Sequence, residues 1–225
     1  MNQGLQRSSL LVGSVVFSLV LTAPAAVGQT EGTGGICIPV AERAAREFGC
    51  FIVATQAIGH LAPRRAFWHL SSFSTRSEAE LVRGTRGTVV ESLGRVWLLT
   101  IANAGWRPAG GTHVAEIGPL PVTPDVAYTA QYLEAVFRPG MKSIVHRHSG
   151  PEAWYTVAGK TCLETPGGTM VGVAGGRPVI VPAGPPMELT ATGTNVRRAL
   201  VLILHDSERP AFSPARDWSP KGLCK

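Results

Sequence analysis

The stretch of sequence that decides the fold reads Gly140-Met141-Lys142-Ser143-Ile144-Val145-His146-Arg147-His148-Ser149-Gly150-Pro151-Glu152. In a β-strand alternate side chains point to the same face, so His146 and His148 would share one face. Ser149-Gly150-Pro151 has the composition of a turn, which would reverse the chain and place Glu152 opposite the two histidines. The stretch therefore predicts that two imidazoles and one carboxylate converge from adjacent strands.

These three side chains form a candidate metal site. Two histidines with one carboxylate are a donor set that leaves coordination positions open on the ion. We predict a divalent ion on His146, His148 and Glu152, and this set does not distinguish among iron, manganese, zinc, nickel and copper. The open positions favour dioxygen or Lewis-acid chemistry. No further residue has the spacing of a general base, so the catalytic residues stay unassigned.

The same stretch resembles the first motif of the cupin superfamily. The pattern Gly-x5-His-x-His-x3-Glu-x6-Gly matches from Gly140 to Gly159 at every defined position. The second cupin motif, Gly-x5-Pro-x-Gly, follows at Gly176, Pro182 and Gly184. The resemblance implies an all-β double-stranded β-helix (jelly-roll) barrel over residues 119–208, with a metal ion and a small-molecule ligand inside. It implies no particular reaction, because cupins differ widely in activity.

Met187 is the departure from the second cupin motif, which usually carries a metal-binding histidine at this position. Met187 alternates with Leu189 and Ala191, which predicts a wholly apolar inward face. A thioether is a soft ligand that suits copper and binds manganese or magnesium poorly. Two alternatives stay open: Met187 packs as a wall of the pocket, which we favour, or it is a fourth ligand.

The rest of the chain is rich in strand and turn signals. Charged residues make up only 16% of the chain, which contains 26 glycines and 17 prolines among 225 residues. Strands are predicted over 51–58, 66–73, 87–92, 95–102, 128–137, 142–148, 153–158, 178–181, 187–192 and 198–205. Helices are predicted over 41–48 and, from the capping box of Thr75 and Glu78, over 75–83. Residues 29–118 thus form a small α+β N-terminal extension or strands added to the main sheet, and residues 209–225 form a tail.

Residues 1–28 have the pattern of a secretory signal peptide. Arg7 precedes an apolar run over 10–21, which is shorter than the roughly 20 residues that span a bilayer. Ala26-Val27-Gly28 has the small-x-small form of a cleavage site. We expect a mature protein that begins near Gln29, is periplasmic or secreted, and has no membrane association. An uncleaved N-terminal anchor is the alternative.

Export changes the interpretation of the four cysteines, because oxidising compartments favour disulfides. Cys37, Cys50, Cys162 and Cys224 are an even set without CxxC spacing, so we predict two disulfides and no zinc or redox role. The connectivity stays open. A helix over 41–48 would hold its ends about 12 Å apart, which disfavours the local pair Cys37–Cys50, since bridged Cα atoms lie within about 7 Å.

The net charge of +6 comes mainly from arginines scattered along the chain. An exported protein without a basic run is a poor candidate for nucleic-acid binding. His60, His69 and His113 are isolated and are expected to be structural. His205 follows an apolar run and is a weaker candidate for a helper role at the mouth of the barrel.

Two functions are compatible with these patterns. The first is a metal-dependent enzyme that acts on a small molecule inside the barrel. The alternative is a non-catalytic protein that binds a metal or a small ligand, and a third possibility is an interaction module in which the barrel is a scaffold. A homodimer is an open alternative for its assembly. The sequence does not separate the first two functions.

Overall fold

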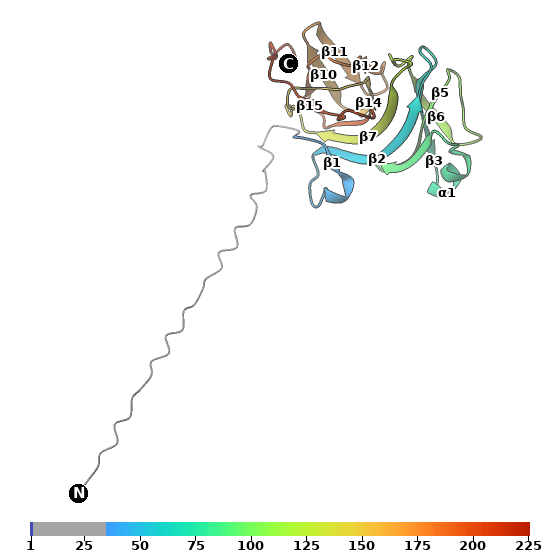
Figure 1. Ribbon diagram of the computed structural model, residues 1–225, viewed down its shortest axis with the longest axis horizontal. Coiled ribbons are helices and arrows are strands. Elements are labelled where there is room, and N and C mark those ends of the chain that lie inside the picture. The colour runs from blue at the N-terminus through green and yellow to red at the C-terminus, as the bar shows by residue number, and fades with distance from the viewer. Residues whose placement is uncertain (2–34) are drawn as a thin grey trace.

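The computed structural model describes Met1 and residues 35–225, which form an almost entirely β structure (Figure 1). A six-stranded sheet has the order β1 (Ile38–Pro39), β2 (Gly49–His60), β7 (Ala127–Phe137), β14 (Arg197–Asp206), β9 (Glu152–Ala158) and β12 (Val179–Val181). A three-stranded sheet has the order β11 (Gly168–Val173), β10 (Lys160–Thr165) and β13 (Glu188–Thr192). The predicted signal peptide lies outside the described residues, apart from Met1.

The two sheets enclose one apolar interior, which makes a barrel. Leu133 and Phe137 of β7 lie in the same buried cluster as Leu163 of β10 and Leu189 of β13. Tyr132 of β7 points to the opposite face of the sheet and belongs to a second cluster. The side chains of β7 therefore alternate between the two clusters, as the two-residue period of a strand requires.

The second cluster joins the barrel to an N-terminal sheet. That sheet has the order β4 (Gly87–Ser92), β5 (Arg95–Ala102), β3 (Phe67–Phe73) and β6 (Thr112–Ile117). Trp68 and Leu99 of this sheet pack with Tyr132 and Leu202 on the outer face of the six-stranded sheet. Meanwhile β2 pairs directly with β7. The N-terminal segment therefore contributes two strands, β1 and β2, to the main sheet and covers its outer face with four more.

The helix predicted from the capping box is confirmed as α1 (Arg76–Val82). The Thr75 side chain accepts from the backbone of Glu78, and the Glu78 side chain accepts from the backbone of Thr75. Together the two side chains satisfy backbone donors that a helix start leaves unpaired. None of the helices in the described part of the chain is long and apolar enough to cross a membrane.

The helix predicted over 41–48 is wrong, because only a short 3₁₀ turn, η1 (Val40–Glu42), forms there. Ala44 has a positive φ, which ends any helical run, and the Arg43 side chain pairs with Glu134 at 2.6 Å. Without the helix, the distance argument against a Cys37–Cys50 bridge no longer holds. The structure pairs Cys37 with Cys50, with Cα atoms 4.5 Å apart.

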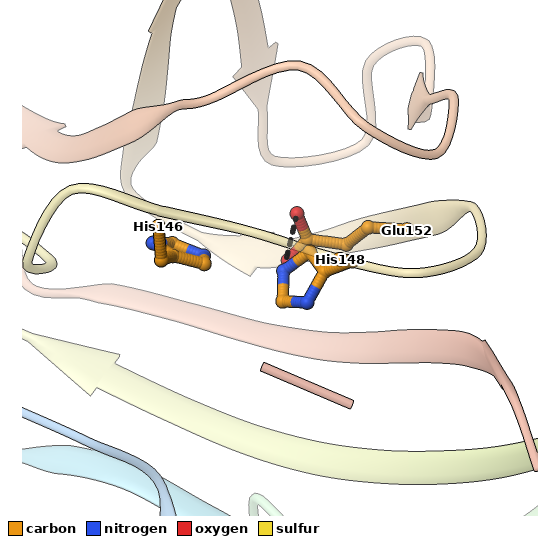
Figure 2. A group of neighbouring side chains, drawn as sticks. All are labelled: His146, His148 and Glu152. Atoms are coloured by element: carbon orange, nitrogen blue, oxygen red, sulfur yellow. Dashed lines mark ion pairs between the residues drawn. The ribbon is translucent and has the colours of Figure 1, made fainter. Parts of the chain in front are cut away.

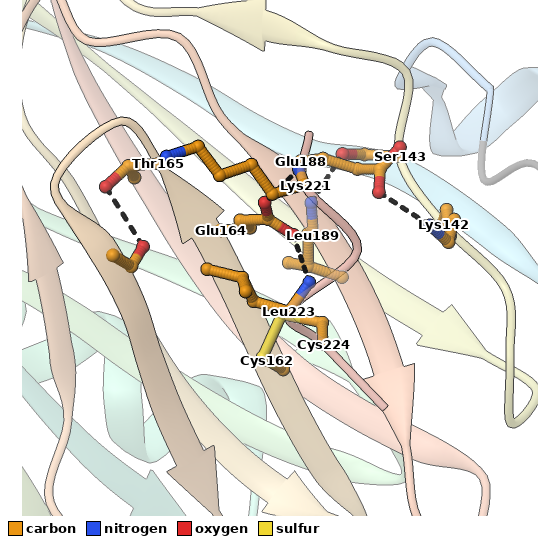
Figure 3. Close-up of a disulfide and its surroundings, with 11 residues drawn as sticks. Lys142, Ser143, Cys162, Glu164, Thr165, Glu188, Leu189, Lys221, Leu223 and Cys224 are labelled. Atoms are coloured by element: carbon orange, nitrogen blue, oxygen red, sulfur yellow. Dashed lines mark hydrogen bonds and ion pairs between the residues drawn. A yellow bond between two sulfur atoms is a disulfide. The ribbon is translucent and has the colours of Figure 1, made fainter. Parts of the chain in front are cut away.

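The second disulfide joins Cys162 of β10 to Cys224 in the C-terminal tail (Figure 3). Glu164 accepts hydrogen bonds from the backbone nitrogens of Lys221 and Leu223, so the end of the tail is held on the barrel at several points. The prediction that all four cysteines pair is confirmed. The sequence missed strands β10 and β11 of this region, whose mixed polar and apolar residues lack a clean alternation.

Two glycines of the cupin-like motif bring turns close to β14. A Cβ on Gly150 would lie 1.9 Å from the carbonyl oxygen of Leu204. A Cβ on Gly159, which has a φ of +71°, would lie 2.8 Å from the Cα of Arg197. Only glycine fits such approaches. The turns before and after β9 therefore pack against opposite ends of β14.

Candidate metal centre

His146 and His148 lie at β8 (His146–Arg147) and immediately after it, and Glu152 begins β9 (Figure 2). The strand predicted over 142–148 is shorter than expected, because only backbone bridges to β13 and Met187 extend it. The backbone of His146 exchanges hydrogen bonds of 3.0 and 2.8 Å with that of Met187. Glu152 is fixed between Val181 and Ile203 on neighbouring strands. The segment between the histidines and Glu152 brings the three side chains together as predicted, but not from adjacent strands, because β8 pairs with β15 whereas β9 lies in the six-stranded sheet.

The structure brings the three side chains together inside the barrel. Their potential ligand atoms lie within 4.8 Å of one another. Nε2 of His148 and Oε2 of Glu152 are 3.6 Å apart, the pair drawn with a dashed line in Figure 2. All three residues are buried. The local pattern of 140–152 was therefore sufficient to find this cluster.

Backbone carbonyls fix the orientation of both imidazole rings. Nδ1 of His146 lies 2.7 Å from the carbonyl oxygen of Ile144, and Nδ1 of His148 lies 2.5 Å from that of Ala211. A carbonyl only accepts, so each Nδ1 carries a proton, and in the neutral ring Nε2 then keeps a free lone pair. Both rings are thereby prepared to offer Nε2 as a ligand.

The C-terminal tail supplies part of this arrangement. Phe212 stacks on the His146 ring, with centroids 4.8 Å apart and an interplanar angle of 23°. Next to it, β15 (Ser213–Pro214) pairs with β8, and Asp217 accepts two hydrogen bonds from Arg147 at 2.7 and 2.8 Å. Sequence reasoning missed these contacts, because the tail carries no spacing signature relative to the histidines.

The protonation of the three groups follows from their burial and proximity. Burial lowers the pKa of His146 to about 4, so this ring is neutral at pH 7. Burial also acts to lower the pKa of His148, but the neighbouring Glu152 carboxylate outweighs it and raises that pKa. Burial acts to raise the pKa of Glu152, and here His148 outweighs it and lowers the pKa. His148 and Glu152 thus favour an ion pair in which Nε2 of His148 is protonated. A bound metal ion would take the place of that proton.

No protein-family model matches the chain, and no curated protein sequence matches it significantly. Solved structures of similar shape include a protein with a double-stranded β-helix domain from Klebsiella pneumoniae subsp. pneumoniae MGH 78578. It is 16% identical, with a TM-score of 0.34, and the match covers 39% of this chain and 76% of that one.

Two further structures match a similar share of the chain. A cupin-like protein from Thermotoga maritima MSB8 is 17% identical, with a TM-score of 0.35 and coverage of 38% of this chain and 64% of that one. An oxalate oxidase in complex with the substrate analogue glycolate is 17% identical, with a TM-score of 0.32 and coverage of 37% and 45%. The barrel has the cupin fold. Two sheets enclose one buried core, and the glycines Gly140, Gly159, Gly176 and Gly184 of the two motif spacings lie in turns or bends between strands.

A cavity of about 310 Å³ opens beside the cluster within the cupin barrel. Its walls are mainly apolar, with Leu133, Leu189 and Val201 among them. Besides the cluster, the polar side chains on its wall are Gln131, Ser143 and Arg197. The cavity can therefore surround a small, largely apolar molecule.

The other residues singled out from the sequence lie elsewhere. Met187 is fully buried in the barrel core, so a packing role is supported, but the prediction that it forms a wall of the pocket is wrong, because it does not line the cavity. His205 Nδ1 contacts the backbone oxygens of Asp206 and Arg209 and does not reach the cavity. His69 is buried in the N-terminal sheet, where Nε2 lies 2.9 Å from the Asn103 oxygen, as expected of a structural histidine.

Proposed function

We propose that this cupin barrel binds a divalent metal ion on His146, His148 and Glu152 and is a metal-dependent enzyme for a small molecule. One observation carries the proposal. Nε2 of His148 and Oε2 of Glu152 are buried and face only each other, at 3.6 Å and without a hydrogen bond, beside a third potential ligand. Such atoms cost about 1–3 kcal/mol each when they stay unsatisfied. A shared ion would satisfy them, and the nitrogen and oxygen donors fit iron, manganese, zinc, nickel or copper.

The chain's own residues would prepare the site for the ion and the small molecule. The carbonyls of Ile144 and Ala211 hold the two rings in the tautomer that leaves Nε2 free. The apolar wall around Leu189 limits the access of water to the bound molecule. With three protein ligands, the ion would keep open positions and supply Lewis-acid or oxygen chemistry there.

The alternative is a barrel that binds a metal or small ligand without turnover. One feature favours it: among the described residues that line the cavity, only the three proposed ligands and Arg197 are ionisable. No separate general base faces the bound molecule there. A reaction in this cavity would therefore have to proceed without any general acid or base other than the three proposed ligands and Arg197.

The two disulfides are typical of a compartment outside the cytoplasm. We infer that the protein is periplasmic or secreted, and that the mature chain begins near Gln29. Nothing in its charge pattern favours a nucleic-acid partner, since the arginines are scattered.

The double variant His146→Ala/His148→Ala tests the metal site. It should lose the ability to take up stoichiometric divalent metal but keep its circular dichroism spectrum, because buried apolar strands and two disulfides hold the barrel. His205→Ala, a change outside the cavity, is the matched control and should bind metal like the unmodified protein. Metal retained by the double variant would show that the site is misassigned.

A further inference from the structure

Arg197 has an unusual place for an arginine, because its side chain is fully buried inside the barrel. It is the first residue of β14 and lines the same cavity as His146, His148 and Glu152. Arginine is almost never fully buried unless it is paired. Its position therefore needs a partner or a function.

The contacts of Arg197 satisfy only part of its guanidinium group. Nε donates a hydrogen bond of 2.6 Å to Oγ1 of Thr161. The guanidinium carbon lies 5.4 Å from the Phe137 ring centroid and 6.0 Å from that of Trp154. Aromatic rings stabilise a cation through its face but offer no acceptor to its N–H groups. Both terminal nitrogens, Nη1 and Nη2, are buried without a hydrogen-bond partner.

The charge of this group is retained in the barrel. Burial lowers the pKa of Arg197 to about 10, and Glu152 acts in the opposite direction, so the side chain remains protonated at neutral pH. A buried cation with two unsatisfied nitrogens is costly unless an anion completes it. Glu152 does not do so, since neither terminal nitrogen has a hydrogen-bond partner.

We propose that Arg197 is the binding site for the carboxylate group of the small molecule that the barrel accommodates. Because Nε is engaged by Thr161, the free edge of the guanidinium is the one formed by Nη1 and Nη2. Two parallel N–H donors on such an edge match the two oxygens of a carboxylate. The apolar walls of the cavity then suit an aliphatic body between Arg197 and the histidine cluster.

This assignment deepens the proposed function by naming the class of small molecule. That the molecule is a substrate rests on the proposed function, but Arg197 can bind a carboxylate whether or not a metal is present. The charges agree with it. A divalent ion on one carboxylate and two neutral imidazoles would leave a net positive charge, and Arg197 adds another. A neutral or cationic molecule would leave both charges uncompensated in a largely apolar cavity.

The test compares propionate with propionamide, which has the same shape without the charge. Calorimetric titration of metal-depleted, full-length mature protein should show that propionate binds and that propionamide binds at least about tenfold more weakly. Arg197→Met should weaken propionate binding by about thirtyfold or more, the usual scale for removal of one partner of a buried charged pair. Arg197→Lys, which keeps the charge but loses the fork, should fall between them. The matched control is Arg198→Met, which removes the same charge from the neighbouring position outside the cavity.

Three results would overturn the proposal: no propionate binding, equal binding of propionamide, or unchanged affinity in Arg197→Met. Inorganic phosphate binding more tightly than propionate would also reject a carboxylate in favour of a tetrahedral anion. If Arg197→Met does not fold, labelled wild-type protein gives the answer. The Arg197 side-chain N–H resonances should then shift with propionate but not with propionamide.

Elemental analysis of the same protein, after incubation with a divalent metal and removal of the excess, separates this proposal from the metal site. Propionate binding that depends on Arg197 in a protein unable to take up metal would contradict the proposed function and leave the carboxylate site standing. Stoichiometric metal without propionate binding would do the reverse.

Discussion

At the scale of single residues, the inner surface of the barrel combines groups from distant parts of the chain. His146, His148 and Glu152 come from one short segment, whereas Arg197 comes from the last long strand. Met187 lies opposite His146 across a backbone bridge, so its side chain is on the same face as that ring. This position is where the cupin pattern places a further ligand.

We expect Met187→His to increase the affinity for divalent metal by about tenfold, since substitutions beside metal ligands commonly change metal affinity by this factor or more. An imidazole there would add a fourth strong donor beside His146. It would also fill a position that the small molecule or oxygen needs, so any turnover should fall as affinity rises. Metal titration and activity, measured together, check the prediction.

Met187→Leu is the matched control, because it keeps the apolar volume without adding a donor and should change neither quantity by much. Unchanged affinity in Met187→His would show that this side chain does not face the ion. Higher affinity together with higher turnover would mean that the open-position account is wrong.

At the scale of elements, the C-terminal tail has two parts with different roles. Its first part carries Ala211 and Phe212, which orient the two histidine rings. Its last part is attached to β10 through the Cys162–Cys224 disulfide and through Glu164 (Figure 3). Between these two parts of the tail, β15 pairs with β8. This pairing holds the first part in place independently of the disulfide.

Two variants separate these roles. Cys162→Ala/Cys224→Ala should lower the free energy of unfolding by roughly 2–4 kcal/mol, as expected for loss of a native disulfide, with metal affinity changed less than about threefold. Phe212→Ala should have the opposite profile. It should weaken metal binding by about tenfold, because the His146 ring loses its stacking partner, with a smaller loss of stability. Chemical denaturation and metal titration of both variants give the result.

The division of the tail would be wrong if loss of the disulfide released the metal as strongly as Phe212→Ala does. In that case the last part of the tail would also be needed to position the ligands.

At the scale of the whole molecule, the accuracy of the sequence predictions depended on the distance along the chain over which each signal acts. The histidine–carboxylate cluster was found because strand alternation and a three-residue turn bring it together within 146–152. The helix predicted over 41–48 was wrong, because local composition was overridden by the Cys37–Cys50 bridge and the Arg43–Glu134 ion pair. Eight residues of moderate propensity do not sustain a helix against such contacts.

The long-range parts of the site could not be predicted. Ala211 and Phe212 follow Glu152 by about sixty residues, and no pattern in the tail relates them to the histidines. Arg197 did carry a usable signal. It alternates with Ala199, Val201 and Ile203, all of which point into the barrel, so extending that strand by one residue would have placed Arg197 inside.

The proposed function requires that the barrel holds a metal ion in the protein as the cell makes it. Elemental analysis of the exported protein, purified without chelators or added metal, tests this most directly. We predict about one divalent ion per chain, since a single three-residue donor set lies in the described part of the chain. Protein that is folded, has both disulfides formed and yet contains no stoichiometric metal would contradict the account.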